Sequence, residues 1–154
     1  MIRVMVEYDE RCTHNERERK QYGSWSEQYS SSITGVRVVG DDEGRSYHSE
    51  VFTVPEGTDK VYVVYMIYST GDSFGRSEGN IDIIHCTASE DAAHALADKI
   101  TKNADEFSIE FTDDFDRPIK ISNRGAGYFE SIDYVSVECY SISSAGKKAR
   151  YYVR

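Results

Sequence analysis

The segment that most constrains the fold is Val61–Tyr68, eight residues in which nearly every position is apolar. Successive side chains of a β-strand point to opposite faces of its sheet, so a strand with one solvated face alternates apolar and polar residues. Val61–Tyr68 lacks this alternation and is apolar on both faces. It therefore predicts a central strand that is covered on both sides.

Eight further segments are predicted as strands, because apolar residues alternate with polar ones or recur between turn signals. Segment 81–86 follows a glycine-rich connection and is predicted to lie beside the central strand. Segment 24–39 fits one long strand or a pair of strands, whereas the charged segment 9–22 predicts an exposed excursion. The remaining predicted strands cover residues 2–8, 47–54, 107–112, 117–122 and 132–142, with 151–153 as a short edge strand.

One helix is predicted, over residues 87–103. Thr87-Ala88-Ser89-Glu90 matches a capping box, in which the threonine hydroxyl and the glutamate carboxylate each bind a backbone N–H. An apolar stripe recurs at helical spacing through Ala93, Leu96, Ala97 and Ile100. The helix is expected to end near Asn103.

These elements predict an α+β fold: a single domain over residues 1–154, with a mostly antiparallel β-sheet and one principal α-helix. A chain of 154 residues is close to the commonest domain size and can bury one sizeable core. Strands outnumber helices heavily in this prediction.

Hydropathy and cysteine usage predict a cytoplasmic protein. The mean hydropathy is -0.59, and no apolar run approaches the roughly 20 residues of a membrane-spanning helix. The opening residues lack the long apolar stretch of a signal peptide. Three cysteines at wide spacing are an odd number, whereas disulfide-stapled secreted domains usually carry an even and denser set: Cys12, Cys86 and Cys139.

The net charge is -9, from 27 acidic and 18 basic residues. This sign argues against direct binding of nucleic acid, which requires a basic surface. It fits a basic protein partner, or imitation of a polyanion, and equally fits simple solubility. The candidate partner-binding carboxylates lie in two clusters, and the candidate aromatic contacts lie in segment 24–39: Asp41, Asp42 and Glu43; Asp113, Asp114 and Asp116; Trp25 and Tyr29.

Two glycine- and arginine-containing segments form an alternative, ligand-binding site. Glycine permits close approach of backbone N–H groups to an anion, and an arginine supplies a charge. If the fold brought both segments together, they could hold a phosphate-bearing ligand with a tyrosine stacked on its base. The glycines serve turn geometry in the simpler interpretation. The residues concerned are Gly71, Asp72, Ser73, Gly75, Arg76, Arg124, Gly125, Gly127 and Tyr128.

No set of residues compels a catalytic or metal-dependent function. Ser73 has no evident His and Asp partners, and a hydrolase at Asp72 and Ser73 would depend on His85 or a carboxylate as base. The pairs Cys12/His14 and His85/Cys86 lack the spacing of a structural zinc site. Asp113, Asp114 and Asp116 offer oxygen ligands but not an EF-hand pattern. We expect no cofactor and no metal.

Several segments resemble a group of small uncharacterised proteins encoded by tailed bacteriophages. They are 23–27 (GSWSE), 68–80 (YSTGDSFGRSEGN) and 125–130 (GAGYFE), together with the opening strand. The resemblance spans most of the chain and carries no assigned activity or catalytic residues. It implies a context, because small acidic phage proteins frequently act on host machinery or counter bacterial defence.

The sequence supports three alternative hypotheses for the function. The first is a phage-encoded, non-enzymatic inhibitor that binds a host or defence protein through an acidic, nucleic-acid-mimicking surface. The second is a protein that binds or sequesters a nucleotide signal through the two glycine- and arginine-containing segments. The third is a hydrolase acting on a phosphate-bearing substrate.

Overall fold

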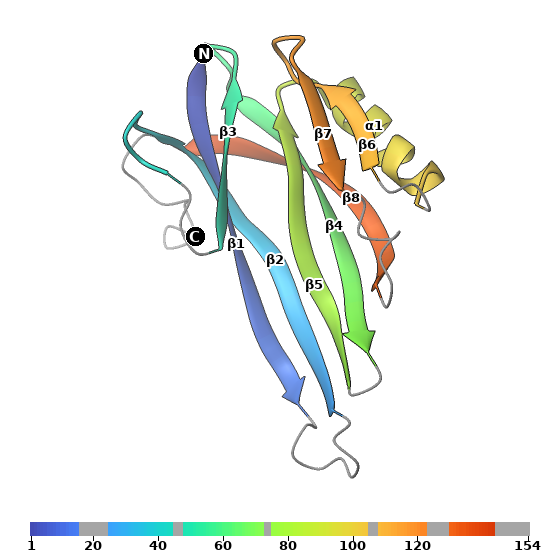
Figure 1. Cartoon of the computed structure of the whole chain (residues 1–154). Coiled ribbons are helices and arrows are strands. Elements are labelled where there is room, and N and C mark those ends of the chain that lie inside the picture. Colours follow the sequence, from blue (N-terminus) through green and yellow to red (C-terminus); the bar gives the residue numbers. More distant parts are fainter. Residues whose placement is uncertain (16–24, 45–47, 73–74, 105–107, 123–129, 144–154) are drawn as a thin grey trace.

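The computed structural model describes residues 1–15, 25–44, 48–72, 75–104, 108–122 and 130–143 (Figure 1). Its elements follow one another along the chain as eight strands and one helix. They are β1 (Ile2–Asn15), β2 (Trp25–Val39), β3 (Ser49–Val54), β4 (Lys60–Asp72), β5 (Gly75–Thr87), α1 (Glu90–Lys102), β6 (Ser108–Thr112), β7 (Pro118–Ser122) and β8 (Glu130–Ser143).

Six strands form one sheet in the order β3-β1-β2-β5-β4-β8, and β6 and β7 form a separate hairpin. The pairing is antiparallel except at two places, where β2 runs parallel to β5 and to β8. The first part of β2 pairs with β5, at Trp25–Gln28. Its last part pairs with β8, at Val36 and Arg37. In Figure 1, β8 accordingly passes behind the other strands to reach β2, and the sheet curls into a partly closed ring.

The predicted α+β class is wrong, because the fold is mostly β with a single 13-residue helix in the described part. The sheet is also mixed and not simply antiparallel. Two polar stretches that predict loops are paired strand instead: β1 continues through residues 9–15, and β4 and β5 continue to Asp72 and Gly75. Register shifts within β1 and within the β4–β5 pair accompany these extensions.

The two-sided burial predicted for Val61–Tyr68 is confirmed. One face of β4 presents Val61, Val63, Tyr65 and Ile67 to an inner core that also contains residues of β1, β2 and β5. The opposite face places Val64 in a second core under the helix, with Ala93, Leu96 and Ile100. The apolar stripe predicted for the helix is therefore the face that packs on the sheet.

The first strand is covered on both faces, whereas the sequence predicts a single buried face. Val4 and Val6 point into the inner core and are fully buried. Met5, on the opposite face, is only 1% exposed. Its sulfur lies 3.5 Å from Nη2 of Arg37 on β2. The long stem of Arg37 can cover apolar surface while its charged group stays near carboxylates, which accounts for the extra burial.

The helix starts at a different cap from the predicted one. Ser89 is the N-cap, and its hydroxyl accepts a hydrogen bond of 3.1 Å from the backbone N–H of Ala92. Thr87 is instead the last residue of β5 and is 1% exposed. The predicted end is confirmed, because Asn103 is the C-cap and its N–H donates to the carbonyl of Lys99.

Gly79 allows β2 and β5 to meet. Its φ is +80°, and a Cβ at this position would lie 2.2 Å from the carbonyl oxygen of Tyr29 on β2. The hydroxyl of Ser31 then donates a 2.7 Å hydrogen bond to the carbonyl of Gly79. A side chain here would be strained in backbone conformation and would also collide with β2. The glycine is therefore required by strand packing.

A carboxylate and two tyrosines connect β4 and β8. The hydroxyl of Tyr65 donates to Oε2 of Glu138 at 2.7 Å, and the hydroxyl of Tyr140 donates to Oε1 of the same carboxylate. Burial and the hydrogen bond to Glu138 raise the pKa of Tyr65 to about 12. The pKa of Tyr140 is raised for the same two reasons. Both phenols are thus held in the protonated form that donates to the carboxylate.

We predict that Gly79→Ala destabilises the fold by at least about 2 kcal/mol, because it adds both a backbone strain and a clash. Gly44→Ala is the matched control, since a Cβ there meets nothing within 4 Å. It should change the free energy of unfolding by less than about 0.5 kcal/mol. Urea unfolding followed by circular dichroism measures both. Equal effects of the two substitutions would contradict the role given to Gly79.

We also predict a loss of stability at alkaline pH. A phenol with a raised pKa stabilises the fold fully below pH 10.0, and this contribution is lost as the pH rises through about 12. The free energy of unfolding of the wild type should therefore decline above pH 10. Tyr65→Phe with Tyr140→Phe should flatten the decline, whereas Tyr134→Phe, at a side chain 54% exposed, should not. An identical decline in all three proteins would contradict the assignment.

Candidate functional site

The first predicted ligand segment lies in paired strands and not in an open loop. Gly71 is paired with Arg76, and Asp72 with Gly75, at the end of the β4–β5 hairpin. Nε of Arg76 lies 2.8 Å from Oε2 of Glu78 in an exposed ion pair. The charge predicted to bind an anion is therefore partly compensated. Ser73 lies outside the described residues, as does the side chain of Asp72.

The second predicted ligand segment also lies outside the described residues. It comprises Arg124, Gly125, Gly127 and Tyr128. Its proximity to the β4–β5 hairpin is consequently still a prediction. The same holds for the edge strand predicted at 151–153.

The acidic turn after β2 presents two carboxylates to solvent. The N–H of Glu43 donates to the carbonyl of Gly40 at 3.2 Å, which closes the turn. Asp41 and Asp42 are exposed in it. Glu43 has a structural contact, because Oε2 lies 2.8 Å from Nη2 of Arg37. Two of the three predicted contact residues in this cluster are thus available to a partner.

Asp113 organises the turn between β6 and β7. One carboxylate oxygen accepts from the N–H groups of Phe115 and Arg117, each at 2.9 Å. The other oxygen lies 2.8 Å from Nε of Arg117. Burial alone would raise the pKa of Asp113, but these hydrogen bonds and the guanidinium lower it below the usual range. The side chain of Asp113 is only 8% exposed, so it serves the turn.

Asp114 fastens the same turn to the start of the helix. Its Oδ2 accepts a 2.9 Å hydrogen bond from the N–H of Ala88, and its Oδ1 accepts from the hydroxyl of Thr87. Asp116 is exposed, with a φ of +60°. The turn is therefore a structural connection in which Asp116 is the exposed carboxylate. No group of three or more His, Cys, Asp or Glu in the described residues could hold a metal ion.

The predicted aromatic contacts lie where β2 runs beside β5. Trp25 pairs with Gly75, and its side chain is outside the described residues. Tyr29 is half-buried, and its hydroxyl lies 3.5 Å from Oε1 of Glu27. Burial, and then the charge of Glu27, raise the pKa of Tyr29.

An exposed tyrosine on β8 is not among the residues that the sequence singles out. Tyr134 is 54% exposed. Its segment predicts a strand with apolar residues on both faces, so the sequence gives no reason to place this ring in solvent. A register shift opposite Ile67 and Tyr68 pairs Ile67 with Tyr134 and Tyr68 with Ile132. Such a shift changes which side chains face the core and has no clear sequence signature.

Acidic residues outnumber basic residues by 27 to 18 in the whole chain. Six of the 27 acidic and nine of the 18 basic residues have side chains that are not described, which leaves 21 acidic against nine basic. Four of these nine cations already form ion pairs with carboxylates: Arg11, Arg37, Arg76 and Arg117. The chain as a whole carries a net charge of -9.

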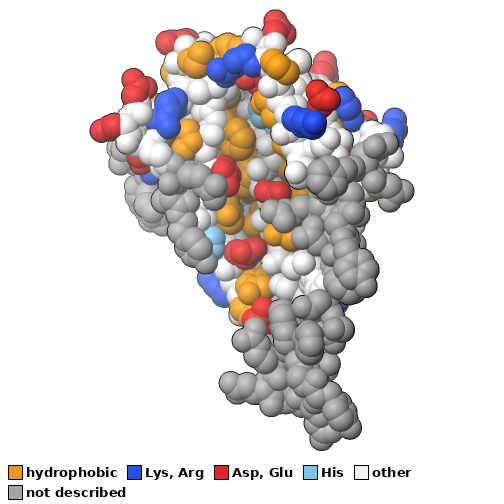
Figure 2. Space-filling model, in the orientation of Figure 1, with side chains coloured by type: hydrophobic (Ala, Val, Ile, Leu, Met, Phe, Trp, Pro, Cys, Tyr) orange, Lys and Arg blue, Asp and Glu red, His pale blue; other side chains and the backbone are white. Residues whose placement is uncertain are grey.

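Figure 2 shows carboxylates on the rim of one face and also along its middle, among hydrophobic side chains. The middle of this face corresponds to the region of β3 and β5 in Figure 1. The carboxylate of Glu10 on β1 has a backbone contact, since its Oε2 accepts from the N–H of Ile81 at 3.2 Å. Acidic groups are thus distributed over the face and not confined to one turn.

Comparisons with protein-family models, curated proteins and solved structures give no match. The described residues include no helix that is long and apolar enough to cross a membrane.

We predict that Asp114→Asn destabilises the protein by about 1 to 3 kcal/mol, because Thr87 and Ala88 lose a charged acceptor at the helix start. Asp116→Asn is the matched control, since it removes an exposed carboxylate from the same turn and asparagine tolerates a positive φ. Thermal unfolding separates the two substitutions. A larger loss for Asp116→Asn would overturn the assignment of Asp114 as the connecting residue.

Proposed function

We propose that this chain is a phage-encoded, non-enzymatic inhibitor that binds a host or defence protein in the cytoplasm of an infected cell. Its carboxylates occupy a basic surface that normally binds nucleic acid. The observation that carries this proposal is the net charge of -9, together with the exposed carboxylates of Asp41, Asp42, Asp91 and Asp98. The phage context comes from the sequence resemblance.

The arrangement of the ion pairs supports a partner of opposite charge. The described cations do not pair with Asp41, Asp42, Asp91 or Asp98, which are exposed on the turn after β2 and on the helix. Uncompensated carboxylates repel one another and attract a basic surface over about 10 Å at 0.1 M salt. The same charge repels nucleic acid, which favours a protein as the partner.

Binding of a nucleotide by the two glycine- and arginine-containing segments is the weaker proposal. Arg76 already contacts Glu78 in the folded chain. An anionic ligand would have to displace that carboxylate before it could bind the guanidinium.

We predict that the tagged chain captures, from host lysate, a nucleic-acid-binding protein that a salt gradient or a competing DNA duplex releases. Electrostatic binding weakens steeply with salt because counterions screen the charges. Asp41→Asn with Asp42→Asn, and separately Asp91→Asn with Asp98→Asn, test the two exposed groups. At least one pair should weaken binding by about tenfold at low salt, measured by interferometry with the purified partner.

Lys60→Gln with Lys120→Gln is the control, because it removes two exposed charges of the opposite sign. This control should bind equally or more tightly. Capture that neither salt nor DNA affects, or equal binding by all the variants, would refute the electrostatic mechanism.

A further inference from the structure

The imidazole of His85 is buried, but it does not belong to the inner core. Ile83 and Cys86 belong to the inner core, whereas a register shift between Val64 and Tyr65 leaves His85 on the other side of β5. Its ring lies between Phe52 and Phe111, with centroids 5.8 Å and 5.0 Å away. The residue is 6% exposed.

The Nε2 atom of His85 is buried and has no hydrogen-bond partner among the described residues. A buried polar atom without a partner costs free energy, and native proteins seldom retain one without a reason. Burial lowers the pKa of His85, although the charges of Asp114 and Asp113 act in the opposite direction. A neutral imidazole has one donor and one acceptor nitrogen, so Nε2 can bind a hydroxyl group in either tautomer.

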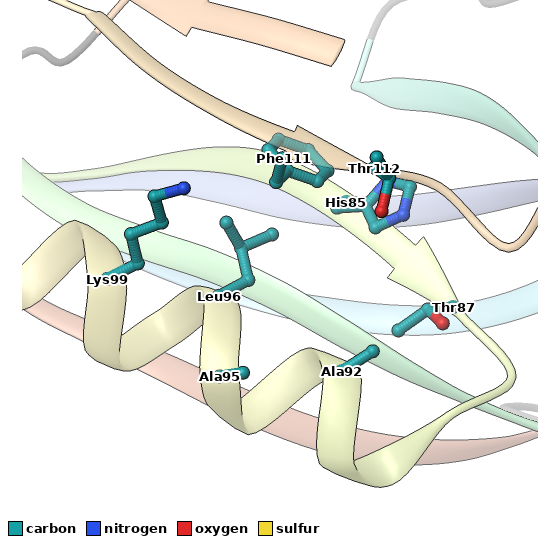
Figure 3. A pocket seen from close by; sticks show the side chains of 8 residues that line it. All are labelled: His85, Thr87, Ala92, Ala95, Leu96, Lys99, Phe111 and Thr112. Carbon is teal, nitrogen blue, oxygen red and sulfur yellow. The ribbon is translucent and has the colours of Figure 1, made fainter. Parts of the chain in front are cut away.

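His85 lines a pocket of about 290 Å³ between the helix and the β5–β6 side of the sheet. Figure 3 shows its ring beside Thr112, with a ring nitrogen towards the side where Thr87 lies. The helix supplies the opposite wall, from Ala92 through Leu96 to Lys99, and Phe111 lies over the middle. The pocket is thus polar at the His85 end, apolar in the middle and cationic at the Lys99 end.

These dimensions and this chemistry fit one kind of ligand. The seven-residue separation of Ala92 and Lys99 corresponds to about 10 Å along a helix, the length of a single substituted ring. The pocket volume is at the lower limit for small-molecule sites, which again fits one ring. Phe111 and Leu96 provide the apolar surface for that ring. The ammonium of Lys99, which donates to the carbonyl of Glu110, lies near the place of an anionic group.

We propose that this pocket binds a small single-ring aromatic anion, with a ring hydroxyl hydrogen-bonded to Nε2 of His85 and the anionic group at Lys99. The ligand fills the apolar middle and gives the imidazole its missing partner. This site is independent of the acidic surface and adds a small-molecule specificity to the chain.

The probe for this proposal is 4-hydroxyphenylacetate, titrated into isotope-labelled protein while the ring signals of the four histidines are followed by NMR. The His85 signal should shift and saturate. Phenylacetate, which lacks the hydroxyl, should bind about tenfold more weakly, the effect of one hydrogen bond of about 1.4 kcal/mol. 4-Hydroxybenzyl alcohol, which lacks the charge, should also bind more weakly.

Two variants and one control complete the experiment. His85→Phe keeps an aromatic ring but removes Nε2, so it should bind 4-hydroxyphenylacetate and phenylacetate equally. Ala95→Trp, at an exposed helix position that lines the pocket, should fill it and abolish binding even if His85→Phe fails to fold. His94→Phe changes an exposed histidine that lies beside Glu90, and it should leave binding unchanged.

No saturable shift of the His85 signal at millimolar 4-hydroxyphenylacetate would overturn the proposal. Undiminished binding by Ala95→Trp, or a hydroxyl preference that persists in His85→Phe, would do the same. None of these outcomes bears on capture of a basic protein, so this proposal and the proposed function can fail separately.

Discussion

The structure depends on the close approach of β2 to β5 at Tyr29 and Gly79. Only a residue without a Cβ fits there, because the carbonyl of Tyr29 occupies the place of the side chain. Before this point β2 is paired with β5, and after it β2 leaves β5 and pairs with β8. The strand thereby connects both sides of the sheet and encloses the inner core, which the long antiparallel hairpins alone would leave open.

Because the sheet closes around the inner core, only its outer face can carry further elements and sites. The inner face of β4 is filled by aliphatic residues and by the Tyr65–Glu138–Tyr140 contacts. The outer face carries the helix and the β6–β7 hairpin, and Asp114 fastens this hairpin to the helix start. The pocket at His85 lies between those two elements. The exposed carboxylates of Asp41, Asp42, Asp91 and Asp98 lie on the turn after β2 and on the helix.

The elements with strong local signals are predictable from the sequence. Uninterrupted apolar character predicted the burial of Val61–Tyr68 on both faces, and helical spacing located the buried face of the helix, with Asn103 as its end. The strand extensions through residues 9–15, 69–72 and 75–80 are not predictable in this way. Their polar side chains match those of loops, and only pairing with a distant strand makes them extended. The α+β class failed for this reason.

The site residues were predictable to a smaller extent. A cluster of aspartates has the same sequence signature whether its carboxylates bind backbone N–H groups, as Asp113 and Asp114 do, or face solvent, as Asp41 and Asp42 do. His85 has an unremarkable position within an apolar strand. Its relation to Phe52 and Phe111 depends on a register shift and on contacts between distant elements. The roles of these aspartates and of His85 depend on contacts between residues that are distant in the sequence, so local sequence patterns do not reveal them.

Hydrogen exchange of individual backbone amides tests the closure of the sheet most directly. If β2 joins β8 as described, the ladder at Val36–Ile142 and Arg37–Ser143 is intact, and its amides exchange slowly, like those at the centre of the β4–β5 pair. The N–H of Ile142 is not a probe of this ladder, because it donates to the carbonyl of Asp59 at 3.0 Å. Exchange of the β8 end at unprotected rates, while β4 and β5 stay protected, would show an open sheet. This result would contradict the closure of the sheet through the pairing of β2 with β8.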